Sequence, residues 1–198
     1  MSAAQAKLVI ISGPSGAGKS TVVKRLLTSC ELPLALSVSA TTRKPRPGEQ
    51  DGVDYFFLTS NEFSQRREAS EFLECKEVFG RGDWYGTLRS VVTAGLTAGK
   101  WVILEIDVEG AMSVLDQCPD TITIFLHPGS AEELEKRLRQ RGTESEDSIQ
   151  RRLEVARREL TLMHRYRFEV INDTVTNAVQ RICEILRSQG AKSPCTKN

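Results

Sequence analysis

The chain has 198 residues, of which 39% are hydrophobic and 27% are charged, and its formal net charge at pH 7 is +1. This length and composition predict a globular protein with one sizeable core and room for a small inserted lobe. The near-neutral charge gives no reason to expect a nucleic acid or an anionic membrane as a partner.

The chain carries no pattern of a secreted or membrane protein. Its first seven residues lack an apolar segment of signal-peptide length, and no apolar run approaches the length of a membrane span. The cysteines are scattered and show no C-x-x-C spacing, so we expect reduced thiols and a cytoplasmic protein. They are Cys30, Cys75, Cys118, Cys183 and Cys195.

The first predicted strand, residues 7–12, leads into a glycine-rich loop. Residues 13–20 read Gly-Pro-Ser-Gly-Ala-Gly-Lys-Ser, which fits the phosphate-binding pattern G-x-x-x-x-G-K-[ST]. Apolar residues with helical spacing follow over 22–27, so the loop lies between a strand and a helix. Its glycines let backbone N–H groups close around an anion at the N-terminus of that helix. We therefore expect Lys19 to reach nucleotide phosphates and Ser20 to ligate Mg²⁺.

The next segment predicts a second anion site. Arg43 and Arg46 lie three residues apart, are stiffened by two prolines, and are followed by Tyr55. Arginine binds phosphate through two parallel hydrogen bonds, so two rigid arginines and a tyrosine hydroxyl form a plausible phosphate site. Two phosphate sites in one small domain fit phosphoryl transfer between nucleotides. The alternative is a surface turn rich in arginine and proline.

Strand-like runs continue through the chain. The runs around Ile10, Ile103 and Ile124 are almost continuously apolar, which is typical of parallel strands covered by helices on both faces. The segment from about Ser39 to Thr93 has shorter and less uniform strands, which indicates a small separate lobe. The predicted strands are 7–12, 35–39, 53–58, 72–78, 101–106, 121–126 and 168–171.

Three helices are predicted in the last third of the chain. The first begins with a capping-box pattern at Ser130 and ends at Gly142. The second follows residues 143–145 with an apolar stripe at Ile149, Leu153, Ala156 and Leu160, and the third covers about 176–188. Alternating strands and helices after a phosphate loop predict a doubly wound α/β core.

These motifs in series resemble the guanylate kinase family, from about residue 7 to about residue 187. The resemblance implies one α/β domain, a P-loop NTPase-type parallel sheet core flanked by helices, with an inserted GMP-binding lobe and a helical lid. The core would cover about 1–38, 94–128 and 158–190, the lobe about 39–93 and the lid about 129–157, before a flexible tail at 191–198. The segments that carry the resemblance are 13–21, 37–49, 52–55, 71–74, 84–87, 104–110 and 137–152.

The resemblance implies the reaction ATP + GMP ⇌ ADP + GDP with Mg²⁺. It also makes dGMP an expected further acceptor, although the sequence does not determine whether dGMP is accepted. The implied partners are the small molecules ATP and GMP, with neither nucleic acid nor membrane. The sequence leaves open whether the protein is a monomer or a homo-oligomer.

The resemblance also implies roles for individual residues. The ATP phosphates would be held by Gly13, Pro14, Ser15, Gly16, Ala17, Gly18, Lys19, Ser20 and Thr21, with Asn172 near the adenine. The GMP phosphate would be held by Arg43, Arg46, Tyr55 and Tyr85. The guanine would be read by Glu74, with Ser39 and Thr87 at the base edge.

Transfer would depend on Lys19, Arg43, Asp107 and the lid arginines Arg137, Arg141 and Arg152. Glu105 shares a strand face with Asp107, which predicts one acidic site.

Other classes of protein remain as alternatives. A non-catalytic module of guanylate-kinase-like fold would not need an intact phosphate loop. A kinase for another phosphorylated acceptor would not need Glu74 together with Ser39 and Thr87, and a nucleotide-hydrolysing switch would not need Arg43 and Arg46.

Overall fold

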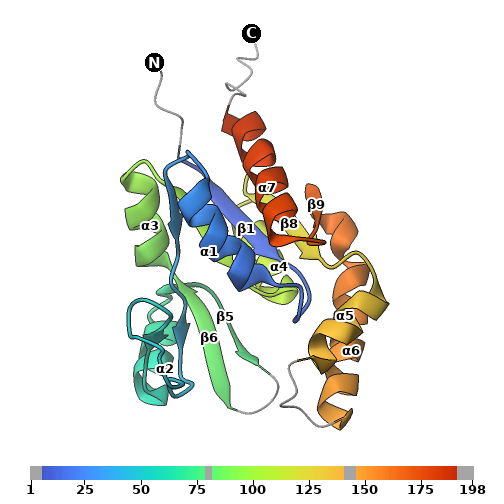
Figure 1. The fold of residues 1–198 in the computed structure, drawn as a ribbon. Coiled ribbons are helices and arrows are strands. Elements are labelled where there is room, and N and C mark those ends of the chain that lie inside the picture. The colour runs from blue at the N-terminus through green and yellow to red at the C-terminus, as the bar shows by residue number, and fades with distance from the viewer. Residues whose placement is uncertain (1–5, 79–81, 141–145, 191–198) are drawn as a thin grey trace.

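The central feature of the fold is a five-stranded parallel sheet. The structure is a computed structural model that describes residues 6–78, 82–140 and 146–190. The sheet has the order β2-β7-β1-β8-β9, with β1 in the middle (Figure 1). Neighbouring strands all run parallel, and Ile10 of β1 lies opposite both Leu104 of β7 and Thr123 of β8. The strands are β1 (Leu8–Ser12), β2 (Leu34–Leu36), β7 (Trp101–Glu105), β8 (Ile122–His127) and β9 (Phe168–Ile171).

Helices cover both faces of this sheet, as the continuous apolar runs predict. Val9 and Ile11 point into a core cluster with α1 (Lys19–Ser29) and α7 (Val175–Gly190). Ile10 points to the other face, where the second cluster contains residues of α3 (Arg89–Thr97) and α4 (Val108–Gln117). The expectation of a mixed α/β core with a parallel sheet is therefore confirmed.

A second, smaller sheet lies beside the core (Figure 1). Its order is β4-β3-β6-β5, from β3 (Ala40–Thr41), β4 (Phe56–Phe57), β5 (Phe72–Val78) and β6 (Asp83–Leu88). It is covered by α2 (Ser60–Glu68), whose Phe63 ring stacks on Phe72 with ring centroids 4.4 Å apart. Thr59 and Glu62 start α2 with a reciprocal capping box.

Two helices, α5 (Ala131–Arg139) and α6 (Glu146–Thr161), pack on each other and precede a short 3₁₀ turn at Met163–Arg165. The Ser130 hydroxyl accepts from the Glu133 amide and starts α5, as its capping pattern predicts. Their shared cluster consists of Leu134, Leu138, Ile149, Leu153 and Ala156. The predicted helix end at Gly142 lies outside the described residues.

Several element predictions need correction. The predicted strand 53–58 reduces to Phe56–Phe57, because Gly52 with φ +72° turns the chain just before it. The predicted strand 35–39 is Leu34–Leu36 instead. Strands β3 and β6 and helices α2, α3 and α4 were not among the predicted elements.

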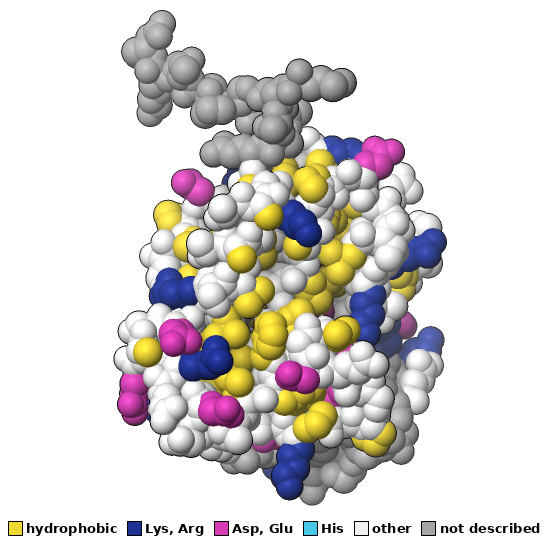
Figure 2. All heavy atoms as spheres, turned by 90° about the vertical axis from the view of Figure 1, so that its left-hand side faces the viewer, with side chains coloured by type: hydrophobic (Ala, Val, Ile, Leu, Met, Phe, Trp, Pro, Cys, Tyr) yellow, Lys and Arg dark blue, Asp and Glu magenta, His cyan; other side chains and the backbone are white. Residues whose placement is uncertain are grey.

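Charged side chains are scattered over the face that carries α2 and α3 (Figure 2). Acidic and basic groups are interspersed there around a band of hydrophobic side chains (Figure 2). In the described ranges, no helix combines the length and the apolarity that a membrane crossing requires.

Candidate active site

The phosphate loop follows β1 and ends at Gly18, the N-cap of α1. Gly18 has φ +85°, a left-handed conformation that favours glycine, and a Cβ there would lie 2.6 Å from Asn172 Nδ2. The Lys19 ammonium folds back over the loop and donates to the carbonyls of Gly13 at 2.6 Å and Pro14 at 3.1 Å. The loop and the start of α1 therefore present backbone N–H groups and one ammonium to the same space.

Asn172, at the end of β9, supports this loop. The residue is 4% exposed, and its side-chain amide donates to the Ala17 carbonyl at 2.7 Å. This contact ties the loop to the edge of the core sheet. Whether Asn172 also contacts an adenine stays a prediction.

An acidic pair lies beside the loop. The Ser20 hydroxyl donates to Glu105 Oε1 at 2.5 Å. Asp107 caps α4 by accepting from the Gly110 amide at 2.8 Å. Strand β7 ends at Glu105, so Asp107 reaches the same cleft from a helix cap and not from strand alternation.

These groups line one open cleft of about 520 Å³ between the phosphate loop and the smaller sheet. The cleft brings together residues that lie far apart in the sequence. Among its lining residues are Ser15, Lys19, Ser20, Ser39, Arg46, Tyr55, Glu74, Tyr85, Glu105 and Asp107.

Arg43 does not line the cleft but is bonded to groups that do. Its guanidinium makes a bidentate pair with Glu49 at 2.9 and 3.0 Å, and its Nε donates to the Tyr85 hydroxyl at 3.0 Å. It also lies 5.3 Å from the centre of the Tyr55 ring. The hydrogen bond with Glu49 is the main cause that raises the pKa of Arg43, and the same bond lowers the pKa of Glu49. The arginine is thus fixed and permanently charged.

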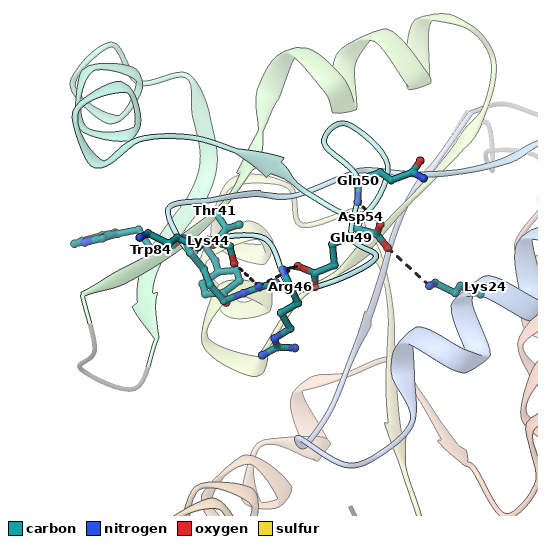
Figure 3. A network of polar contacts seen from close by, with 10 residues as sticks. Lys24, Thr41, Lys44, Arg46, Glu49, Gln50, Asp54 and Trp84 are labelled. Atoms are coloured by element: carbon teal, nitrogen blue, oxygen red, sulfur yellow. Dashed lines mark hydrogen bonds and ion pairs between the residues drawn. The ribbon is translucent and has the colours of Figure 1, made fainter. Parts of the chain in front are cut away.

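Glu49 is a partner that the sequence analysis missed. It also accepts from the backbone amide of Arg46 at 2.7 Å, while the Arg46 side chain extends from the turn (Figure 3). Nearby, Lys24 of α1 approaches Asp54 at 4.0 Å, so the turn also faces the core (Figure 3). The sequence offered one signal for this pairing, which is that Glu49 lies in the same arginine- and proline-rich segment as Arg43 and Arg46.

Glu74 lies deeper, on β5. Its Oε1 accepts from the Thr87 hydroxyl at 2.7 Å across the β5–β6 pair. Burial raises the pKa of Glu74; the hydrogen bond with Thr87 lowers it, Asp107 raises it and Lys76 lowers it. A carboxylate in this position is fixed by its neighbours and can accept from a ligand.

Two of the three predicted lid arginines reach the phosphate loop or its support. Arg137 donates to Glu133 at 2.9 Å and to the Asn172 carbonyl at 2.8 Å. Arg152 donates to the Ser15 hydroxyl at 2.9 Å, across 137 positions of sequence. The third, Arg141, lies outside the described residues.

Comparison with known proteins identifies the family of this chain. The family model described as guanylate kinase matches residues 5–189. The guanylate kinase of Rhodopirellula baltica is 62% identical over 97% of this chain and 92% of its own length, and that of Corynebacterium diphtheriae is 49% identical over 91% and 94%. The crystal structure of guanylate kinase from Anaplasma phagocytophilum superposes with a TM-score of 0.77 at 30% identity, over 98% of this chain and 90% of that one. The chain therefore belongs to the guanylate kinase family, the kinases that use ATP to phosphorylate GMP to GDP.

Proposed function

We propose that this guanylate kinase carries out its transfer in the cleft between the phosphate loop and the smaller sheet. The γ-phosphoryl group of MgATP passes there to the phosphate of GMP. One observation carries the proposal: a single cleft joins the Lys19 loop to a second cationic group and to a buried carboxylate. The ATP phosphates lie against residues 13–21, and GMP lies against the smaller sheet.

The acceptor phosphate is assigned to Arg46, Tyr55 and Tyr85, with Arg43 behind them. Arg43 is bonded to Tyr85 and Glu49, so it is already oriented before a ligand arrives. Preorganised charge loses little entropy on binding, which favours tight capture of a phosphate.

Glu74 is assigned to the guanine base, with Ser39 and Thr87 beside it. Its carboxylate can accept hydrogen bonds from the N1–H and the exocyclic amine of guanine. Adenine lacks that amine and presents a lone pair at N1, so it would leave the half-buried Glu74 Oε2, the oxygen that Thr87 does not bond, without a donor from the base. Such an unpaired polar group discriminates strongly between substrates.

The chemistry needs positioning and positive charge more than it needs a general base. The GMP phosphate has a second pKa of about 6, so it is already a nucleophilic anion at neutral pH. Lys19, Arg137, Arg141 and Arg152 would stabilise the charge on the transferred group. Asp107 would order the acceptor beside Lys19, and helices α5 and α6 would exclude water as a lid.

The residues present fit Mg²⁺, a hard cation that prefers oxygen ligands. Ser20 offers a hydroxyl oxygen, and its hydroxyl donates a hydrogen bond to Glu105 that orients that oxygen. Among the described residues, no cluster of three His, Cys, Asp or Glu side chains is placed to hold a metal. This fits an ion that takes most of its ligands from phosphate and water. When bound, Mg²⁺ neutralises phosphate charge during transfer.

We also propose the division into parts that the family resemblance implies: a core, a GMP-binding lobe at about 39–93 and a lid at about 129–157. The smaller sheet falls within the proposed lobe, and α5 and α6 begin within the proposed lid. We propose a cytoplasmic location, which the free thiols of Cys30, Cys75, Cys118 and Cys183 support.

The test is a coupled assay of ADP release with MgATP and each of GMP, dGMP, AMP, CMP, UMP and dTMP. We expect turnover with the guanine nucleotides alone. Lys19→Ala should fold normally and lower kcat by about 100-fold or more, whereas Arg25→Ala, at an exposed position of the same helix, should match the wild type. A folded protein that binds GMP without any turnover would be a binding module instead. Near-normal turnover of Lys19→Ala would contradict the loop assignment.

A further inference from the structure

Lys76 lies on β5, two residues after Glu74, so the two side chains share one face of the strand. In the pairing of β5 with β6, Thr87 lies opposite Glu74 and Tyr85 lies opposite Lys76. Side chains that are directly opposite each other project from the same face of a sheet. Lys76 thus belongs to the group of side chains that faces the cleft, and it lines the cleft together with Glu74 and Tyr85.

The Lys76 ammonium joins this strand to the first turn of α4. It lies 2.9 Å from Asp107 Oδ2 and 2.7 Å from Glu109 Oε2. The side chains of Lys76 and Asp107 are 29% and 34% exposed, whereas that of Glu109 is 79% exposed, so solvent screens the pair with Asp107 less than the pair with Glu109. At the other end of α4, Gln117 donates to the Leu73 carbonyl at 2.8 Å. Strand β5 is therefore held along α4 at both ends.

Glu74 is crowded by negative charge from this same turn. A Cβ added at Gly110 would lie 3.0 Å from Glu74 Oε2 and 3.4 Å from Asp107 Oδ1. The carboxylates of Glu74 and Asp107 therefore lie close to each other on either side of Gly110. The other ionisable groups that face this region are Glu105 at the end of β7, Glu109 on α4, Tyr85 on β6, Glu159 on α6 and Lys19 of α1. Lys76 contacts two of these carboxylates, Asp107 and Glu109, directly.

We propose that Lys76 is a positioning and specificity residue for the acceptor. Its ammonium ties β5 to the start of α4 and offsets the negative charge beside Glu74, so that Glu74 remains an ionised acceptor for guanine. This inference rests on the proposed function, because it requires Glu74 to read the base.

The electrostatic consequence has a definite sign. Burial raises the pKa of Glu74, the hydrogen bond with Thr87 lowers it, Asp107 raises it and Lys76 lowers it. Removing the ammonium leaves only the hydrogen bonds with Thr87 to oppose burial and Asp107, so the pKa of Glu74 rises and more of it is protonated at a given pH. Protonated Glu74 places a donor against the donors of guanine, and acceptor binding weakens.

The experiment measures kcat and KM for GMP from about pH 6 to about pH 9 with saturating MgATP. Lys76→Met should raise the KM for GMP by about 3-fold at the acidic end of this range, with a smaller effect at its alkaline end and a much smaller change in kcat. It should also move the acidic limb of kcat/KM upward by about half a pH unit or more. The GMP phosphate titrates identically in every variant, so a difference between variants reports the protein. Lys76 also lowers the pKa of Glu159, so the comparison is repeated in the background of Glu159→Gln, where a persisting shift reports Glu74.

Two matched variants separate charge from packing. Lys76→Arg keeps the charge and should restore the acidic limb. Glu109→Gln removes one of the two carboxylates that pair with Lys76 but keeps the ammonium. The acidic limb of its kcat/KM profile should therefore stay at the wild-type pH. Lys76→Gln is a second neutral variant in case Lys76→Met does not fold, which circular dichroism would reveal.

The inference would be overturned if Lys76→Met had the same pH profile and the same KM for GMP as the wild type. The variant Glu74→Gln separates the role of Lys76 from the assignment of Glu74 as the base reader. If Glu74→Gln loses selectivity for GMP while Lys76→Met behaves as wild type, only the role of Lys76 falls. If Glu74→Gln keeps its selectivity, the assignment of the base reader falls, and the role of Lys76 falls with it.

Discussion

The hydroxyl of Thr87 donates a hydrogen bond of 2.7 Å to the carboxylate of Glu74 across the two longest strands of the smaller sheet. This bond fixes one carboxylate oxygen, while the other lies against Gly110 at the start of α4. The proposed base reader is thus held by the smaller sheet and faces the core. Recognition of guanine would therefore depend on how these two parts meet.

Glu74→Gln should reduce selectivity for guanine more than it reduces phosphate binding. Glutamine keeps the shape of the side chain but replaces an acceptor oxygen with a donor amide. We expect kcat/KM for GMP to fall by about 10- to 100-fold relative to the value for AMP, measured in the coupled assay. An unchanged ratio between the two acceptors would argue against this role.

Arg137→Ala should slow transfer without a comparable loss of substrate binding. Arg137 lies on α5 and bonds to the Asn172 carbonyl beside the phosphate loop. Loss of a cation that stabilises the transferred group should lower kcat by about 100-fold. Arg139→Ala is the control on the same helix, since Arg139 pairs with Glu135 and Glu146 at the exposed face. Equal effects of the two substitutions would point to helix stability and not to catalysis.

Gly110→Ala should impair the acceptor site while leaving the fold intact. Gly110 lies within α4, where alanine favours the helix by about 1 kcal/mol. The new methyl would nevertheless lie 3.0 Å from Glu74 Oε2 and displace that carboxylate. We expect the KM for GMP to rise by about 10-fold with no loss of thermal stability. Ser113→Ala, at an exposed position of the same helix, is the control and should leave the KM unchanged.

Glu159→Gln should stabilise the protein at alkaline pH. Burial raises the pKa of Glu159 to about 7, with Lys19 opposing that shift and Asp107 adding to it. Its Oε2 is buried and has no hydrogen-bond partner among the described residues. A carboxyl whose folded pKa lies above its unfolded value contributes stability below about pH 4, and this contribution is lost as the pH rises through about 7.

Urea unfolding at two pH values checks this sign. At about pH 8.5 the free energy of unfolding of Glu159→Gln should exceed that of the wild type by about 1 to 3 kcal/mol. At about pH 4 the two values should nearly agree. Glu154→Gln, at an exposed position of the same helix, should show no such pH dependence. A wild type that is more stable than Glu159→Gln at alkaline pH would contradict the argument.

The sequence predicted the core better than the smaller sheet. Buried parallel strands such as Ile122–His127 are continuously apolar, so their pattern is visible without any partner. Strand β3 has only two residues, which is too short for a recognisable pattern. Strand β6 contains Gly86, which interrupts its pattern of strand-forming residues. Gly86 is required there because a Cβ would lie 2.8 Å from both Phe72 and Cys75, a constraint that only the folded sheet creates.

By itself the sequence determined the phosphate loop, the α/β class and the identity of half of the residues that line the cleft. These depend on local order: a strand, a glycine-rich turn and a helix that follow one another, and motifs in series. Only the tertiary structure decided which groups meet, such as Arg152 with Ser15 and Lys76 with Asp107 and Glu109. The reason is physical. Conformational preference acts over a few neighbouring residues, whereas hydrogen bonds and ion pairs depend on distances of about 3 Å that long-range packing sets.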